Sequence, residues 1–280
     1  MGKKKNKDSK KSNIIIYILL ILILLVLYAR YIEPMNLFII EYKIESKDIP
    51  KNFDGIKIVH FSDIHYGRTV DNRYLEKIVD MINKQKPDIV IYTGDFIDED
   101  INLSDKKIAE INKILNKIDS TLGNYAVAGN HDMKYFSNYK KILDNNFTLL
   151  DNQQKILYYK DNEAISLIGL ADSLESTINY EILNKESMYY TFVICHEPDE
   201  FDKIKKYDFD VMLSGHSHNG QIRAPFIGTI TTPPGAKKYY DEHYSIDNKE
   251  IFVSNGIGTS GINLRFMSRP SISLYRLYSE

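Results

Sequence analysis

Residues 56–65 read IKIVHFSDIH, and this stretch sets the pattern from which the fold is predicted. The run at 56–61 is rich in β-branched residues and stops abruptly at Ser62, after which Asp63 and His65 follow. A short apolar run with such a stop is typical of a buried strand. The two chemically active side chains therefore stand at the carboxyl end of a predicted strand.

Four further apolar runs end in the same way, at 89–92, 125–128, 191–195 and 210–213. The polar residues that follow them are, in order, Asp95, Asn130 with His131, His196, and His216 with His218. Taken singly, each has an ordinary structural explanation, such as a turn or a buried histidine. Because the carboxyl ends of strands in an open α/β sheet converge on one crevice, we expect all of these side chains to meet there.

Helical patterns separate the early strands. Residues 73–86 carry apolar side chains at helical spacing after Asp71 and Asn72, either of which can cap the helix. Ser104 can cap a second helix that extends to about residue 118. Helices alternate with strands early in the chain and strands dominate later, which predicts a layered α/β (α+β) sandwich.

The N-terminal part has a different character. Residues 1–11 hold six lysines and one aspartate, a charge of +5 in a chain of net charge −2, which leaves −7 for the remainder. Residues 14–29 carry no charge, and a helix of that length spans about 24 Å, which Arg30 and flanking tyrosines extend toward a hydrocarbon core of about 30 Å. We therefore expect a basic cytoplasmic tip at 1–13, an uncleaved transmembrane anchor at 14–31 and a catalytic domain at 32–280.

Lysines before an apolar segment stay on the cytoplasmic side, so the catalytic domain is predicted on the outer side of a single-pass cell-membrane protein. One alternative is a buried helix of a soluble protein, although this segment has no polar face for solvent. A cleaved signal peptide is the other, although the segment ends without the small residues of a cleavage site.

Composition narrows the chemistry of the site. The 36 Lys and Arg do not exceed the 38 Asp and Glu, which argues against a nucleic-acid binder, and the single Cys195 excludes a cysteine-rich zinc site. Histidine, aspartate and one asparagine form a nitrogen and oxygen shell that suits zinc, manganese or iron. Seven candidate ligands are too many for one tetrahedral ion and suit two divalent ions that share a carboxylate.

In their order along the chain, these motifs resemble those of the calcineurin-like metallophosphoesterases, and of their membrane-associated bacterial branch in particular. The matching residues are Asp63-Ile64-His65, Gly94-Asp95-Phe96-Ile97-Asp98, Gly129-Asn130-His131-Asp132, His196, and Gly215-His216-Ser217-His218. The resemblance extends from about Glu41 to the C-terminus. It implies a four-layer αββα sandwich in which two mixed sheets pack face to face with helices outside.

The resemblance also implies a role for each residue. Asp63, His65 and His218 would hold one metal ion, Asn130, His196 and His216 would hold the other, and Asp95 would bridge them. A hydroxide between the ions would attack phosphorus, and His131, oriented by Asp132, would bind the phosphate or protonate the leaving oxygen. Asp98 would lie just behind the ligands. The chain departs from the branch at Asn219, where glycine is usual, and at Glu99, where protein phosphatases of the wider family have an arginine.

The predicted function is hydrolysis of a phosphodiester, a pyrophosphate or a lipid-linked phosphate of the cell envelope. A phosphodiesterase for soluble nucleotides is one alternative, and a metal-free interaction module on the same fold is another. The stretches 226–227 and 264–266 hold the apolar residues Phe226, Ile227, Leu264 and Phe266, and can either contact acyl chains or belong to the core or an ordinary loop. Lys237, Lys238 and Arg265 would have to gather near the site to offset the repulsion between an acidic body and anionic lipids.

Overall fold

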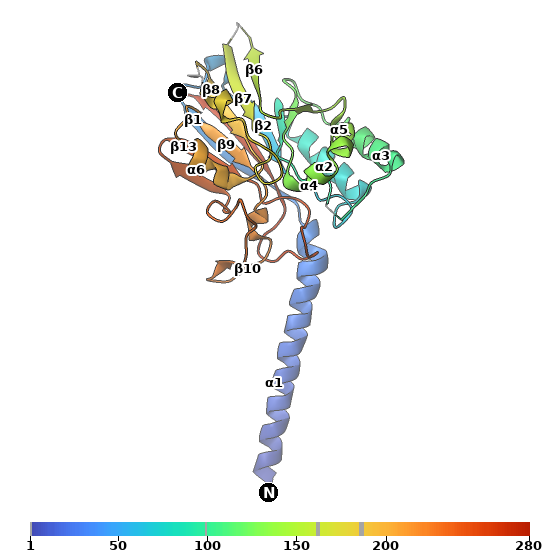
Figure 1. The fold of residues 1–280 in the computed structure, drawn as a ribbon. Helices are drawn as coiled ribbons and strands as arrows, with labels where there is room; N and C mark the ends of the chain where they lie inside the picture. The colour runs from blue at the N-terminus through green and yellow to red at the C-terminus, as the bar shows by residue number, and fades with distance from the viewer. Residues whose placement is uncertain (1, 99, 161–162, 185–187) are drawn as a thin grey trace.

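The computed structural model describes residues 2–98, 100–160, 163–184 and 188–280. A long N-terminal helix, α1 (Gly2–Leu27), stands clear of a body built on two packed sheets (Figure 1). The helix continues through a π-helical turn at Tyr28–Ile32 and a 3-10 turn at Glu33–Met35, after which β1 (Phe38–Ser46) enters the body.

The first sheet has the strand order β1-β14-β2-β3-β4-β5 in the described residues. The strands after β1 are β14 (Ser271–Ser279), β2 (Lys57–Phe61), β3 (Ile89–Tyr92), β4 (Asn124–Ala126) and β5 (Thr148–Leu149). Strand β14 runs antiparallel to β2, whereas the other neighbours are parallel. The first and last strands of the body therefore lie side by side, in register from Phe38 opposite Ser271 to Ser46 opposite Ser279.

The second sheet has the order β12-β13-β9-β8-β7-β6 in the described residues. Its strands are β12 (His243–Ile246), β13 (Lys249–Val253), β9 (Val211–Ser214), β8 (Tyr190–Ile194), β7 (Glu163–Gly169) and β6 (Gln153–Tyr159). The four central strands are parallel and both outer pairs are antiparallel. Both sheets are thus mixed, as predicted.

Alternation along the strands divides the core into three layers. Ile58 and Ile91 point into the space between the sheets, where they join Phe192 and Leu213. The other face of the first sheet packs against α2 (Asn72–Lys84), α3 (Asp105–Leu115) and α5 (Phe136–Leu143). The outer face of the second sheet is covered by the short helix α6 (Phe201–Ile204) and by 3-10 turns and loops. The predicted sandwich is confirmed, with a thin fourth layer.

The predicted helix starts are confirmed at the level of single hydrogen bonds. The Asp71 side chain accepts the backbone N–H of Tyr74 at 2.9 Å, and the Ser104 hydroxyl accepts that of Lys107 at 3.3 Å. Sequence patterns missed α5, β6, β12 and a small hairpin formed by β10 (Arg223–Ala224) and β11 (Gly228–Thr229). The domain boundary at residue 32 stays a prediction.

The N-terminal helix has the length and composition of a membrane span. Among the described residues, the segment Lys11–Met35 is the one that meets this criterion, with a mean hydropathy of 2.7 and only 6% of its apolar window buried. Large apolar side chains from Ile14 to Leu27 are all exposed. The same properties fit a signal sequence, so the helix by itself establishes an apolar N-terminal segment.

Candidate functional site

The predicted site residues come from both sheets. Asp63 and His65 follow β2, Asp95 follows β3, and Asn130 begins the short helix α4 (Asn130–Lys134) after β4. His196 follows β8 of the second sheet, and His216 and His218 follow β9. The strand-end pattern predicts a single sheet edge, whereas the structure joins the carboxyl ends of two face-to-face sheets. The site therefore lies across the seam of the sandwich.

Sharp backbone turns bring these side chains together. Asp63, His65, Asp95, His216 and His218 all adopt left-handed conformations, with φ between 43° and 67°. Such conformations are costly for residues other than glycine and gather at functional sites. Here the left-handed residues reverse the backbone just after the strand that precedes them, so that the first polar side chains of the following loop lie over the edge of the sheet.

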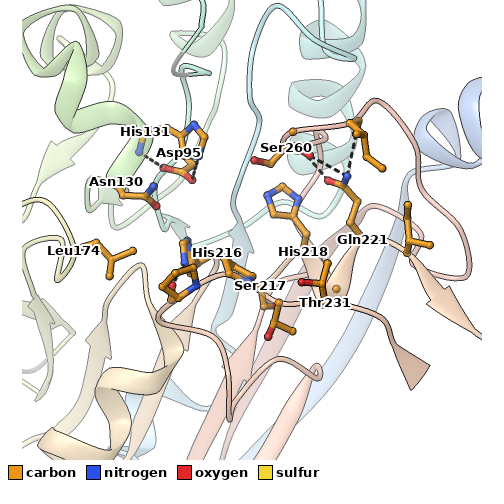
Figure 2. A pocket seen from close by; sticks show the side chains of 17 residues that line it. Asp95, Asn130, His131, Leu174, His216, Ser217, His218, Gln221, Thr231 and Ser260 are labelled. Atoms are coloured by element: carbon orange, nitrogen blue, oxygen red, sulfur yellow. Dashed lines mark hydrogen bonds and ion pairs between the residues drawn. The ribbon is translucent and has the colours of Figure 1, made fainter. Parts of the chain in front are cut away.

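Two groups of side chains form at the seam. In one group, His218 Nε2 lies 3.1 Å from His65 Nε2 and 3.5 Å from Asp63 Oδ1. In the other, His196 Nε2 lies 3.2 Å from Asp95 Oδ2 and 3.1 Å from His216 Nδ1. Asp95 Oδ2 is also 3.7 Å from His65 Nε2, so this carboxylate stands between the groups. Figure 2 shows Asp95, Asn130 and His131 facing His216 and His218 across the pocket.

The hydrogen bonds of two histidines fix which ring nitrogen faces the site. His196 Nδ1 lies 2.6 Å from the carbonyl oxygen of Thr93, and His216 Nε2 lies 2.6 Å from that of Pro234. A carbonyl only accepts, so both of these nitrogens carry protons, which leaves His196 Nε2 and His216 Nδ1 directed at each other. This arrangement is the one that orients histidines as metal ligands.

The donor set fits two cations. Among the described residues, three overlapping groups of acidic and histidine side chains place their donor atoms within 4.8 Å of one another: Asp63 with His65 and His218, His65 with Asp95 and His131, and Asp95 with His196 and His216. The Asn130 side-chain oxygen is buried without a hydrogen-bond partner. Burial alone would lower the pKa of His196, but the Asp95 carboxylate raises that pKa well above its usual value. The negative charge of Asp95 that favours a proton on His196 also favours a metal ion at the same place.

The buried Asp132 side chain binds the backbone of the loop that carries Asp95. Its buried Oδ2 accepts the backbone N–H groups of Asp95 at 2.7 Å and Gly129 at 3.1 Å. Its Oδ1 accepts those of Phe96 at 2.8 Å and Ile97 at 3.1 Å. These four amide donors make Asp132 a residue that fixes the loop carrying Asp95. Orientation of the His131 ring by Asp132 stays a prediction.

Asp98 lies beside His65, one of the predicted metal ligands. Its Oδ2 is 3.4 Å from His65 Nδ1, and it forms an ion pair with Arg68, which also pairs with Asp100 at 2.8 Å. The two partners hold the pKa of Asp98 below its usual range despite burial, which raises it. Arg68 is not among the predicted site residues, because an arginine in a loop gives no local indication in the sequence of the partner it binds.

Arg265 belongs to the core, which is one of the two alternatives given for residues 264–266. The side chain is fully buried, with Nη2 at 3.2 Å from His218 Nδ1 and at 2.6 Å from the carbonyl oxygen of Gly258. Leu264 and Phe266 are half-buried. Lys238 pairs with Asp202 at 2.8 Å, and Lys237 bonds the carbonyl of Thr232 at the pocket wall. The three basic residues therefore do not gather into one patch.

A pocket of about 580 Å³ opens over the site. Polar side chains line one part of it, including Asp95, Asn130 and His131, and the His131 side chain is 14% exposed. The remaining walls include Leu174, Ile222, Ile262 and a stretch of the chain at 231–234. Gln221 fixes one of these walls, because its side-chain amide exchanges hydrogen bonds with the backbone of Ser260 (Figure 2).

Comparisons with known proteins agree with this geometry. A family model described as calcineurin-like phosphoesterase matches residues 56–220. The chain is 34% identical to the metallophosphoesterase YkuE of Bacillus subtilis (strain 168), over 90% of this chain and 89% of that protein. It is 25% identical to the phosphodiesterase YaeI of Escherichia coli (strain K12), over 89% and 92%. It is 24% identical to the UDP-2,3-diacylglucosamine pyrophosphatase LpxG of Chlamydia muridarum (strain MoPn / Nigg), over 91% and 93%.

Proposed function

This chain belongs to the calcineurin-like phosphoesterases, a family of metal-dependent hydrolases of phosphoric ester bonds. From this premise we propose that it is a membrane-anchored enzyme acting on a phosphodiester, a pyrophosphate or a lipid-linked phosphate. The observation that carries the proposal is the pair of buried donor groups between which Asp95 stands. A scaffold without metal has no need for facing histidine nitrogens and an unpartnered amide oxygen in its interior.

Each group has a distinct assignment. Asp63, His65 and His218 would hold one divalent ion, Asn130, His196 and His216 would hold the other, and Asp95 would be shared between them. When bound, the two ions would supply an activated water and positive charge for the phosphoryl oxygens. Zinc, manganese and iron all suit this nitrogen and oxygen set.

His131 is the residue assigned to the substrate. Its backbone N–H donates to Asp95 Oδ1 at 2.9 Å, which ties the residue to the shared carboxylate. Its Nε2 lies 4.0 Å from Asp95 Oδ2, and its partly exposed ring lines the pocket. From this position the ring would donate a hydrogen bond to a phosphoryl oxygen or a proton to the leaving oxygen.

The apolar helix α1 supports placement at the membrane. Its exposed apolar side chains fit a hydrocarbon core, and the lysines before them favour a cytoplasmic N-terminus with the body outside. Two relatives with named activities, a phosphodiesterase and a UDP-2,3-diacylglucosamine pyrophosphatase, support the proposed range of phosphate bonds.

Metal analysis combined with hydrolysis of bis-p-nitrophenyl phosphate tests the enzyme assignment. The purified full chain in detergent should bind two divalent ions per molecule and hydrolyse the diester when Mn²⁺ or Zn²⁺ is supplied. Asp95→Asn should lose activity by roughly a hundredfold or more, because it weakens both groups at once. Equal activity of the variant and the wild type would refute the assignment.

Two further measurements separate the substrates and the topology. When lipid phosphates and nucleotides are compared under the same conditions, the enzyme should hydrolyse the lipids faster. A clear preference for cyclic nucleotides would instead indicate the phosphodiesterase for soluble nucleotides. Protease added to intact cells should remove the body from the outer surface. Full protection of the body would overturn the outward orientation.

A further inference from the structure

The surface beside the pocket carries several large apolar residues that are exposed to solvent. Phe226 and Ile227 form the tip of the β10–β11 hairpin, and the exposed fraction of Ile227 is 79%. Ile230 follows the hairpin, and Ile262 and Met267 lie on the neighbouring loop, each more than half exposed. A contiguous group of exposed large apolar residues marks an interaction site.

The hairpin holds its aromatic residue in an unfavourable conformation. Ile227 N donates to the carbonyl oxygen of Ala224 at 3.2 Å, which closes a turn with Pro225 and Phe226 at its centre. Phe226 has φ of +66° at the turn position where glycine is preferred. An exposed, bulky residue at such a position is not explained by packing or by turn chemistry, which points to a contact outside the chain.

Hydrogen bonds fix the hairpin relative to α1. At its base, Arg223 N donates to the carbonyl oxygen of Phe266 at 2.8 Å, and Phe266 N donates to that of Gln221 at 3.1 Å. The next residues along the loop reach the helix end, because Arg265 N donates to the Ala29 carbonyl at 2.9 Å and Ser268 N donates to Glu33 Oε1 at 2.7 Å. The helix end, the loop and the hairpin therefore form one connected unit.

This unit presents the hairpin toward the membrane that α1 would cross. Figure 1 shows the β10–β11 hairpin at the end of the body from which α1 leaves. Arg30 and Arg269 lie where the helix meets the body, and Arg269 donates to the Asn36 side chain at 3.1 Å. Cationic groups at this level fit the phosphates of lipid headgroups, with apolar side chains reaching below them.

We infer that the hairpin tip, Phe226 and Ile227, is a second contact with the bilayer and delivers a phosphorylated lipid from the membrane to the pocket. The segments that carry the exposed apolar residues also form pocket walls through Ile222 and Ile262. A lipid can keep its acyl chains in the bilayer beside these walls while its phosphate reaches His131. The inference rests on the membrane anchoring proposed above and adds the surface and the substrate class.

Single tryptophans provide a direct test, because the natural chain contains none. Phe226→Trp, Tyr17→Trp within α1, and Tyr158→Trp on β6 at the far end of the body would each be reconstituted as the full chain in vesicles. Lipids brominated on their acyl chains quench a nearby indole. We expect quenching and blue-shifted emission at positions 17 and 226, and neither at position 158.

The three positions distinguish the possible failures. Quenching at 17 with water-like emission at 226 would overturn the hairpin contact and leave the anchoring intact. Absence of quenching at both would overturn the anchoring and the inference together. Quenching at 226 in a chain that hydrolyses no phosphate ester would retain the membrane contact and remove the delivery of substrate.

Activity gives the second readout. The double variant Phe226→Ser/Ile227→Ser should hydrolyse a phosphorylated lipid in vesicles roughly tenfold more slowly, because apolar area that reaches the bilayer is removed. Its hydrolysis of bis-p-nitrophenyl phosphate should not change, since neither residue lines the pocket. Tyr158→Ser, an exposed apolar residue on β6, is the matched control and should leave both activities unchanged. An equal loss on both substrates would contradict the inference.

Discussion

Replacement of Asp132 by asparagine tests whether a buried carboxylate builds the loop of Asp95. The two carboxylate oxygens accept four backbone N–H groups at 2.7–3.1 Å, and the side chain is fully buried. Asparagine has nearly the same shape but a single oxygen. Whichever way the amide turns, its NH₂ group faces two backbone donors that have lost their acceptor.

The cost follows from the number of donors left unpaired. A buried amide N–H without an acceptor costs about 1–3 kcal/mol, so two of them predict a loss of roughly 3–4 kcal/mol in the free energy of unfolding. A domain has about 5–15 kcal/mol in total, so the variant should still fold. Because two of the donors belong to Asp95 and Phe96, we also expect metal affinity and activity to fall by roughly ten- to a hundredfold.

Urea unfolding of the full chain in detergent measures the first quantity, and metal content with diester hydrolysis measures the second. With a slope of about 3 kcal/mol per molar, the midpoint should fall by roughly 1 M. Asp71→Asn is the matched control, because its side chain accepts one N–H, from Tyr74, and asparagine caps helices equally well. If Asp132→Asn behaves like Asp71→Asn, the four-donor explanation is wrong.

Three other perturbations have definite expected outcomes. Gly129→Ala places a methyl group 2.3 Å from Asp95 Oδ1, so metal binding and hydrolysis should fall below detection, and wild-type activity would refute the close approach. His60 is buried, and burial lowers its pKa to about 3. In the unfolded chain this side chain binds a proton near pH 6.5, so the free energy of unfolding should fall by about 2 kcal/mol between pH 7 and pH 5. His60→Gln should remove this contribution to the pH-dependent shift of the urea midpoint. Asp98→Asn weakens the interaction between residue 98 and the His65 ring, so a chelator should remove metal at a roughly tenfold lower concentration. Unchanged chelator sensitivity would show that Asp98 does not support metal binding.

The connection between α1 and the metal site has a practical consequence for truncated chains. Glu33 is buried and accepts the N–H of Ser268, whose hydroxyl in turn donates to the carbonyl oxygen of His218 at 2.8 Å. Arg265 links the Ala29 carbonyl to the His218 ring in the same way. A body cut after residue 36 loses these contacts, so measurements on the full chain are the appropriate reference.

Asn219 shows how structure explains a departure from the family pattern. Its φ is +50°, a conformation that favours glycine and that asparagine tolerates better than most residues. The side chain also accepts a hydrogen bond from Arg223, at the base of the hairpin. The residue thus retains the turn after His218 and adds a link to the β10–β11 hairpin.

The sequence by itself determined the local elements and the chemical identity of the site. Strands such as Ile89–Tyr92 and the capped starts of α2 and α3 follow from short-range pattern and from side chains that bond to amides three residues away. The types and order of the polar residues at strand ends indicated two metal ions, because nitrogen and oxygen donors restrict the choice of ligand chemistry. Elements with weak alternation, such as the edge strand β6, gave no such signal.

Tertiary structure alone decided how the predicted site residues contact one another and which further residues join them. The packing of the two sheets brought His196 and His216 to Asp95. A loop about 36 residues away in the sequence supplied amide donors to Asp132. Packing beside His218 buried the Arg265 side chain. The hairpin was decided in the same way, since its direction depends on bonds between residues more than two hundred positions apart. Local propensities reach only a few residues along the chain, whereas these contacts exist only once both sheets have packed.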